Sequence, residues 1–343
     1  MVWRRPLTLG LKHITIGISY RVAPIRLSYT DLNMEGSNII NESGVGFLRS
    51  LSPAIRKCPY SGSPPFIEIW ENERHQRKST TRSEWILLTG VDEKTFSQRF
   101  LNHPHPPQWS SYDKVLNLLL VRMTKSITHE DSAIIFHNKI LQAVIAKGLD
   151  PDLLVYCGRA TRQGSVGAKE ADFAYLPREF FNGASEDWPS VVLETAFSED
   201  QSKLVSDVRF WLNGSEGKVK IVFTMKIHSK SNVTIDKWEP SDGRSHRTQH
   251  IEIMKRNNGN VLVSGHPLVL EFEKLLLRAG NGPQETDIVF DETQLKSLAS
   301  HIWQTYSKEY PNWRNHVNNI SNYRSKIITE LTSLRWMVHS RAT

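Results

Sequence analysis

Two acidic residues lie within segments that have the pattern of β-strands. Asp172 belongs to ADFAYLP and Glu194 to SVVLETAF, and both segments are short and rich in apolar residues. Side chains alternate along a strand, so each carboxylate is confined to one face of its own strand. If the two strands are neighbours, both carboxylates can converge at one end. Two carboxylates in that position suit Mg²⁺, which can lower the pKa of a bound water for attack on a phosphodiester.

Helices and strands alternate around these acids. Residues 129–150 have helical spacing, residues 153–157 predict a strand, and residues 200–217 predict a covering helix. Residues 218–227 alternate apolar and polar side chains, which predicts a half-buried strand. The expected buried face of the first helix consists of Ile134, Ile135, Ile140, Leu141, Val144 and Ile145. The expected polar face of the 218–227 strand carries Lys218, Lys220, Thr224 and Lys226.

The segments on either side are less regular. Between loop-forming stretches, residues 65–70 and 83–90 predict short strands, and residues 93–103 predict a helix. Residues 112–126 have apolar residues at helical spacing. Further along, residues 232–265 predict an antiparallel extension with turns at Asp-Gly and Asn-Gly, and residues 291–310 and 317–340 predict helices.

The composition limits the class of protein. The chain has 343 residues, a net charge of +7 and a pI near 9.3, which favours an anionic partner such as nucleic acid. The mean hydropathy is −0.41, and no apolar run approaches the roughly 18 residues of a membrane span. Only two cysteines occur, Cys58 and Cys157, which is too few for a disulfide framework or a zinc site. We expect an intracellular protein without membrane segments.

A helix, a strand, an acidic strand, a second acidic strand and a covering helix follow one another in the order of the PD-(D/E)XK nuclease core. The passage from SVGAKEADFAYLPREF to DWPSVVLETAFSEDQSKLVSDVRFWLNGSEG resembles a group of fungal hypothetical proteins. Their pattern runs Lys-Glu-Pro-Asp, then Trp-Pro and an apolar stretch with Glu, then Asp-(two residues)-Trp-Trp-Leu. The chain is also similar to a bacterial restriction-endonuclease family with an Asp and a Glu on neighbouring strands. The resemblance covers about residues 132–303.

The resemblance implies a mixed α/β (α+β) fold with a restriction-endonuclease-like central mixed sheet flanked by helices. It implies Mg²⁺-dependent hydrolysis of DNA or RNA, with Asp172 and Glu194 as catalytic residues and metal ligands. In the nuclease family a lysine two residues beyond the Glu activates the attacking water, but this chain has Ala196 there. A lysine from the following helix could take over that role, and Lys203 is the leading candidate.

Weaker candidates for the missing lysine are Lys169 and Lys220, and Glu130 or His137 could add a metal ligand. Each residue also has a structural interpretation. Asp172 could pair with Lys169 or Arg178, and Glu194 within an apolar strand would need a partner or a metal to offset desolvation. Lys203 and Asp207 could form a helical salt bridge worth roughly 0.3–0.5 kcal/mol. The aromatic residues nearby, Trp188, Phe210 and Trp211, are expected to be core residues.

We expect three parts: an N-terminal extension (1–109), a nuclease-like domain (110–310) and a C-terminal helix (311–343). The alternative to an enzyme is a catalytically inactive module of the same fold that binds nucleic acid or protein. The first acidic residue is Asp31, preceded by five basic residues, a bias that transit peptides share. The stretch LGLKHITIGISY before Asp31, however, alternates apolar and polar residues as a strand does. We therefore expect the nucleus or cytoplasm, with the mitochondrion as the alternative.

Overall fold

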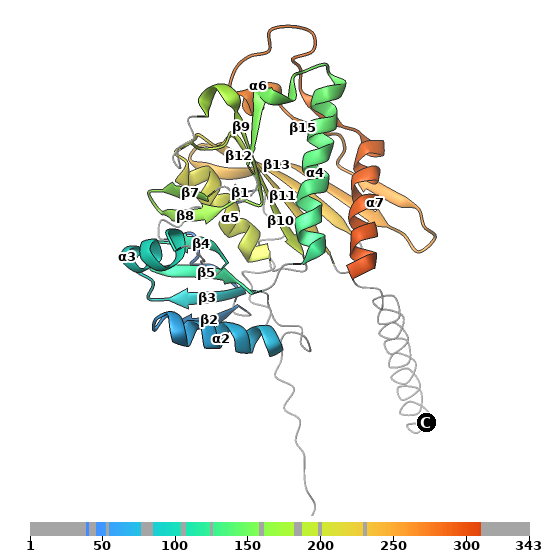
Figure 1. Cartoon of the computed structure of the whole chain (residues 1–343). Helices are drawn as coiled ribbons and strands as arrows, with labels where there is room; N and C mark the ends of the chain where they lie inside the picture. The colour runs from blue at the N-terminus through green and yellow to red at the C-terminus, as the bar shows by residue number, and fades with distance from the viewer. Residues whose placement is uncertain are drawn as a thin grey trace, which may run out of the picture. The chain divides into compact units, whose positions relative to one another are not determined.

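The computed structural model shows a chain of several sheets and helices (Figure 1). It describes residues 39–40, 46–52, 55–76, 85–103, 108–123, 126–157, 161–181, 187–197, 201–228 and 232–309. The basic stretch before Asp31 and the expected C-terminal helix (311–343) lie outside these residues. Within the described part, no helix is both long enough and apolar enough to cross a membrane.

The central sheet contains the expected nuclease-like order of elements. In chain order these are α4 (Ile127–Ala146), β6 (Leu154–Cys157), β9 (Phe173–Pro177), β10 (Val191–Phe197), α5 (Gln201–Gly214) and β11 (Ile221–Ile227). Strand β9 pairs antiparallel with both β6 and β10, whereas β10 and β11 are parallel. A parallel pair needs a crossover, which α5 supplies. The mixed α+β fold with a central mixed sheet flanked by helices is therefore confirmed.

An antiparallel extension continues the sheet beyond β11, as expected. It consists of β12 (Val233–Ser241), β13 (Arg244–Lys255), β14 (Val261–Ser264) and β1 (Ile39–Ile40). A small sheet of β15 (Leu268–Leu270) and β16 (Ile288–Phe290), with α6 (Phe272–Leu276), precedes α7 (Glu292–Glu309). Helices α4 and α7 pack side by side over the central sheet (Figure 1). Two 3-10 turns, Pro151–Leu153 and Arg178–Phe180, flank β6 and β9.

A second sheet is built from both sides of the expected domain boundary after residue 109. Its order is β2 (Arg56–Pro59), β3 (Trp85–Thr89), β5 (Leu118–Arg122), β4 (Trp109–Asp113), β8 (Gly167–Glu170) and β7 (Thr161–Gly164). The β7–β8 hairpin is inserted between β6 and β9 of the central sheet, yet it pairs with β4. Helices α2 (Ser63–Gln76) and α3 (Glu93–Phe96) and a π-helix (Ser97–Leu101) accompany this sheet. The division at residue 109 stays a prediction, but a continuous sheet crosses it.

Two expectations about local structure were wrong. Residues 65–70 belong to helix α2 and not to a strand, because Pro64 and Pro65 occupy its first turn, where proline is favoured. The described residues of 112–126 do not form one helix, because they include the end of β4 and all of β5. The turn between them is held by the Asp113 carboxylate, which accepts bonds from the backbone N–H groups of residues 115 and 116, and by Asn117 at φ 52°. The expected helix at 93–103 is present as α3 and the π-helix.

The buried face of α4 agrees with the expectation only in part, because Ile140 and Val144 are buried as expected but two other residues are not. Ile134 and Ile145 are 49% and 55% exposed, whereas Ala133 and Phe136 are buried. The helix has apolar residues around much of its circumference, so the sequence pattern did not identify the side that packs on the sheet. Strand β11 was expected to be half-buried, but it is covered on both faces, because α5 packs on the side that carries Thr224.

Candidate active site

The two acids are brought together at the end of the β9–β10 pairing. The antiparallel ladder ends with Leu193 opposite Phe173, and the next residues along the two strands are Glu194 and Asp172. The backbone N–H of Thr195 donates a 2.8 Å hydrogen bond to the Asp172 carboxylate, so the strands stay close beyond the last pair. Glu194 therefore lies within β10, and Asp172 directly precedes the neighbouring strand β9.

Asp172 is held by donors on the α4 side of the sheet. Its Oδ2 accepts hydrogen bonds from the backbone and hydroxyl of Thr195 and lies 3.3 Å from His129 Nε2. Burial alone would raise the pKa of Asp172, but His129, together with the charges of Lys203 and Arg122, holds the pKa well below its usual value. Asp172 is therefore a carboxylate at neutral pH.

Glu194 is held from the opposite, α5 side. Its side chain is 1% exposed, and its Oε1 accepts a 2.5 Å hydrogen bond from Trp211 Nε1 and lies 3.3 Å from Lys169 Nζ. Burial raises the pKa of Glu194 to about 8, against the lowering effect of Lys169 and with a further increase from Asp207. In the protein as it stands, Glu194 is mostly protonated at neutral pH, unlike Asp172.

Lys203 lies on α5 close to both acids. Its Nζ is 2.8 Å from Asp207 Oδ2 and 4.7 Å from the centre of the Trp85 ring. The expected helical pair with Asp207 is thus present, but both side chains are buried, unlike a surface salt bridge. The charge of Lys203 lowers the pKa of Asp172 and of Glu194, which places it within electrostatic reach of the two acids.

Lys169, a weaker candidate in the sequence, forms more contacts with the acids. Its side chain is fully buried, with Nζ 2.8 Å from Asp207 Oδ1, 3.3 Å from Glu194 and 3.5 Å from Ser111 Oγ. It does not form the expected surface pair with Asp172. Periodicity could not show this, because Lys169 comes from β8, and only the pairing of β8 with β4 turns it toward the central sheet. The sequence feature that could have identified Lys169 is its place in the Lys-Glu-Pro-Asp pattern.

Other expected participants lie elsewhere. His137 stacks on Phe173 at 4.3 Å, and burial lowers the pKa of this histidine, so its surroundings are apolar. Lys220 donates to a backbone carbonyl in the turn before β11. Arg178 donates to the backbone carbonyl of Asp152 and not to the acid at the start of β9. The three aromatic residues Trp188, Phe210 and Trp211 are buried, as expected.

A small cavity of about 50 Å³ adjoins Asp172. The second sheet and α4 supply most of its walls, including the charged residues Arg122 and Glu130. Glu130, expected as a further ligand, lies 3.9 Å from Arg122 Nη1. The full lining is Trp85, Gln108, Trp109, Ser110, Arg122, Glu130, Glu170, Ala171 and Asp172.

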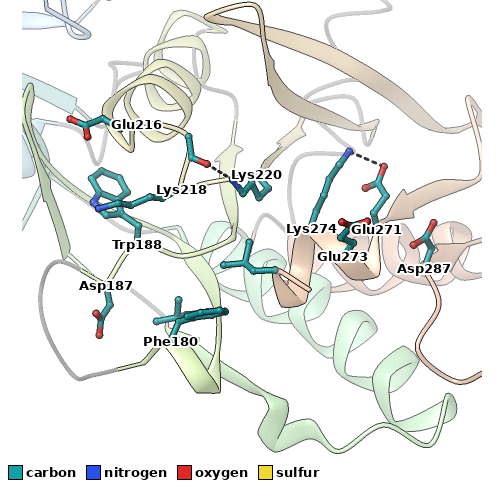
Figure 2. Close-up of a pocket in the computed structure, with 13 residues that line it drawn as sticks. Phe180, Asp187, Trp188, Glu216, Lys218, Lys220, Glu271, Glu273, Lys274 and Asp287 are labelled. Atoms are coloured by element: carbon teal, nitrogen blue, oxygen red, sulfur yellow. Dashed lines mark hydrogen bonds and ion pairs between the residues drawn. The ribbon is translucent and has the colours of Figure 1, made fainter. Parts of the chain in front are cut away.

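A much larger cavity of about 1050 Å³ lies at the other end of the same strands (Figure 2). It is lined by residues at the end of β9 and just after it, by residues that precede β10, β11 and β16, and by residues in and beside α6. Neither Asp172 nor Glu194 is among them. Figure 2 shows Lys218, Lys220 and Lys274 among five carboxylates, those of Asp187, Glu216, Glu271, Glu273 and Asp287. With more acidic than basic side chains, this cavity does not favour a phosphate backbone.

The two carboxylates are held by donors on opposite sides of the sheet and interact electrostatically, so the fit of each to Mg²⁺ is considered separately. Among the described residues, no group of three or more His, Cys, Asp or Glu could hold a metal ion. Mg²⁺, however, is often bound by one or two carboxylates together with water and substrate phosphates. Asp172 is ionised and adjoins a cavity, so it fits as it stands. Glu194 fits once it loses its proton, because a divalent cation would then neutralise it in place of Lys169.

Comparison with solved structures gives a distant likeness. No protein-family model matches the chain, and no curated protein matches it. The chain is similar to the crystal structure of "a putative nuclease belonging to DUF820" from Anabaena variabilis ATCC 29413, with a TM-score of 0.36 and 10% sequence identity, over 58% of this chain and 96% of that one. A likeness this distant does not support an argument about activity. The fold assignment depends on the order and pairing of the strands, and the resemblance to fungal proteins stays a prediction.

Proposed function

We propose that this domain is a divergent metal-dependent nuclease that hydrolyses phosphodiester bonds in DNA or RNA at Asp172 and Glu194. The observation that carries the proposal is the position of these acids directly beyond the last paired residues of two antiparallel strands. Lys169 and Lys203 lie around them, so the site combines two acids with two ammonium groups. Such a set can bind a cation and also offset the negative charge of a phosphate.

In this proposal Asp172 and Glu194 hold Mg²⁺, which when bound supplies an activated water and neutralises developing charge. Thr195 and His129 orient the Asp172 carboxylate and keep it ionised. Lys203 takes the role that Ala196 leaves vacant and supplies positive charge from α5. Lys169, paired with Asp207 at 2.8 Å, would add positive charge beside Glu194.

A second candidate function is a catalytically inactive module that binds nucleic acid or protein. The supporting observation is that Lys169 already neutralises Asp207 and contacts Glu194 inside the protein. Buried ion pairs of this kind also serve as purely structural groups. The absence of a lysine at position 196 points in the same direction.

The test is incubation of the purified full chain with plasmid DNA, single-stranded DNA and RNA, in Mg²⁺ or Mn²⁺, beside Glu194→Gln. Glutamine also has an oxygen that can accept the hydrogen bond from Trp211, and burial favours the neutral form of Glu194, so we expect the variant to fold. We expect cleavage by the natural chain and none by the variant. Equal cleavage by both would reject the site. Salt-sensitive binding without cleavage would favour the inactive module.

A further inference from the structure

The large cavity at the other end of strands β9, β10 and β11 takes no part in the proposed nuclease site. Its volume of about 1050 Å³ is close to the upper end of the roughly 300–1000 Å³ that ligand pockets occupy. Five carboxylates and three ammonium groups line it, an excess of two negative charges, although the whole chain carries a net charge of +7. An acidic cavity in a basic protein favours a cationic occupant.

The carboxylates of the cavity are spread around its wall. Figure 2 shows Asp187 and Glu216 on one side, and Glu271, Glu273 and Asp287 on the other. Among the described residues, no three histidine, cysteine or acidic side chains could hold a metal ion together. We therefore expect an occupant with several separate positive charges along its length, and not a single metal ion.

Some charged groups in the wall are already paired inside the protein. Lys274 forms ion pairs with Glu271 and with a second glutamate outside the lining, and Lys220 donates to a backbone carbonyl. In the described part of the chain, the exposed side chains of Glu216 and Glu273 form no ion pair and no hydrogen bond. These two carboxylates, from opposite sides of the cavity in Figure 2, are therefore available to a cationic ligand.

Trp188 adds a donor that lacks an acceptor. It is 9% exposed, its ring packs against Phe210 and Trp211, and its indole N–H donates to no residue that the structure describes. Leaving a largely buried N–H without an acceptor is unfavourable, so the ligand should carry an oxygen. A peptide has a carbonyl acceptor at every residue, whereas a polyamine has none.

The apolar part of the lining suits the stem of a lysine side chain. It consists of Leu176, Phe180, Trp188 and Leu277, and Phe180 is 45% exposed. Lysine covers apolar surface with its methylene groups and keeps its ammonium group at a polar end. An apolar wall between separate carboxylates matches both parts of that side chain.

We propose that this cavity binds a lysine-rich peptide segment of a partner protein. Ammonium groups of the peptide pair with Glu216 and Glu273, and their methylene stems lie on the apolar wall. A backbone carbonyl of the peptide accepts the indole N–H of Trp188. The inference is independent of the nuclease function, because neither Asp172 nor Glu194 lines this cavity.

The first experiment measures the binding of capped tetralysine to the purified full chain by titration calorimetry at low salt. The variants are Glu216→Gln, Glu273→Gln and both together, with Glu93→Gln as the matched control. Glu93 is an exposed glutamate of α3 that does not line the cavity. Each cavity variant removes one exposed ion pair and should weaken binding by about 2- to 5-fold, and the double variant by about 4- to 25-fold.

The control variant and a modified peptide show whether the binding is specific. Glu93→Gln should bind tetralysine as tightly as the natural chain does. Acetylation of the peptide's lysines removes their charge and should abolish binding. Absence of binding by the natural chain, or equal affinity of the natural chain and the double variant, overturns the inference.

The second experiment separates a peptide from a free polyamine. It compares tetralysine with spermine, a linear polyamine of the same charge, on the natural chain and on Trp188→Phe, which keeps an aromatic ring without an N–H. Loss of one hydrogen bond should weaken tetralysine binding by about 2- to 10-fold and leave spermine binding unchanged. Equal affinity of the natural chain for the two ligands, which requires no variant to fold, would assign the cavity to a polyamine. An equal loss for both ligands in Trp188→Phe would contradict the contact with a peptide carbonyl.

Discussion

The two ends of strands β9, β10 and β11 present opposite combinations of size and charge. One end has a large cavity of about 1050 Å³ with many exposed charged side chains, and the other has a cavity of about 50 Å³ beside a buried cluster of acids and lysines. At the large cavity, Lys274 bridges Glu239 and Glu271 with a side chain that is 37% exposed. At the acid pair, the lysines are almost fully buried. The candidate site therefore lies where charged side chains are buried and close together, and not at the larger cavity.

The largest expected difference between the two ends is in catalysis. Asp172→Asn and Glu194→Gln should each reduce cleavage by more than about 100-fold. Loss of a residue that only supports a metal ligand costs up to about 100-fold, and these two residues are proposed as the ligands themselves. Lys274→Gln, in the large cavity, should leave cleavage unchanged. The measurement is the initial rate on plasmid and single-stranded substrates in Mg²⁺. A large loss in Lys274→Gln with full activity in Asp172→Asn would reverse the assignment of the two ends.

A second difference between the two ends should appear in stability when the lysine at each end is replaced by methionine. Lys169→Met removes one of the two buried ammonium groups beside Asp207 and the one that contacts Glu194, which should cost about 3–5 kcal/mol of the free energy of unfolding. Lys274→Met removes a partly exposed pair and should cost less than about 1 kcal/mol. Urea denaturation of both variants at neutral pH gives the two values. Similar losses in the free energy of unfolding would show that Lys169 stabilises the fold no more than Lys274 does.

The smallest expected difference is in the pH dependence of stability. Burial alone would raise the pKa of Glu271 in the large cavity, but its hydrogen bond from Lys237 and the charge of Lys274 hold the pKa below its usual value. The unfolded chain therefore binds the proton more readily, so this contribution to stability is present above the unfolded pKa and is lost as pH falls through the folded one. Glu271→Gln should flatten the stability curve below about pH 4.5, the ordinary range for this side chain. An unchanged slope in acid would contradict the Lys237–Glu271 interaction.

Much of the central sheet could be predicted from the sequence, because its strands and α5 have strong periodic patterns. Asp172, Glu194 and Lys203 were identified from these patterns and from the resemblance, and the structure brings them together. The second sheet could not be predicted in the same way. Its strands come from three separate parts of the chain, and the turn at Asn117 depends on a side-chain contact from Asp113 that hydrophobic periodicity does not encode.

The surroundings of the acids were predicted only in part, for the same reason. Lys169 and Arg122 belong to strands of the second sheet, so their approach to the acids depends on how the two sheets meet and not on local spacing. The side of α4 that packs inward was ambiguous because its apolar residues surround the helix. Sequence patterns therefore identified the acids, whereas tertiary contacts determine which cations accompany them.

The central claim is that Asp172 and Glu194 share one divalent cation. Its most direct test is the binding of Mn²⁺, followed by electron paramagnetic resonance, to the full chain, Asp172→Asn, Glu194→Gln and Lys274→Gln without nucleic acid. We expect one bound Mn²⁺ in the natural chain and in Lys274→Gln, and loss of that ion in each of the two acid variants. Binding that is absent from the natural chain, or unchanged in both acid variants, would contradict the claim.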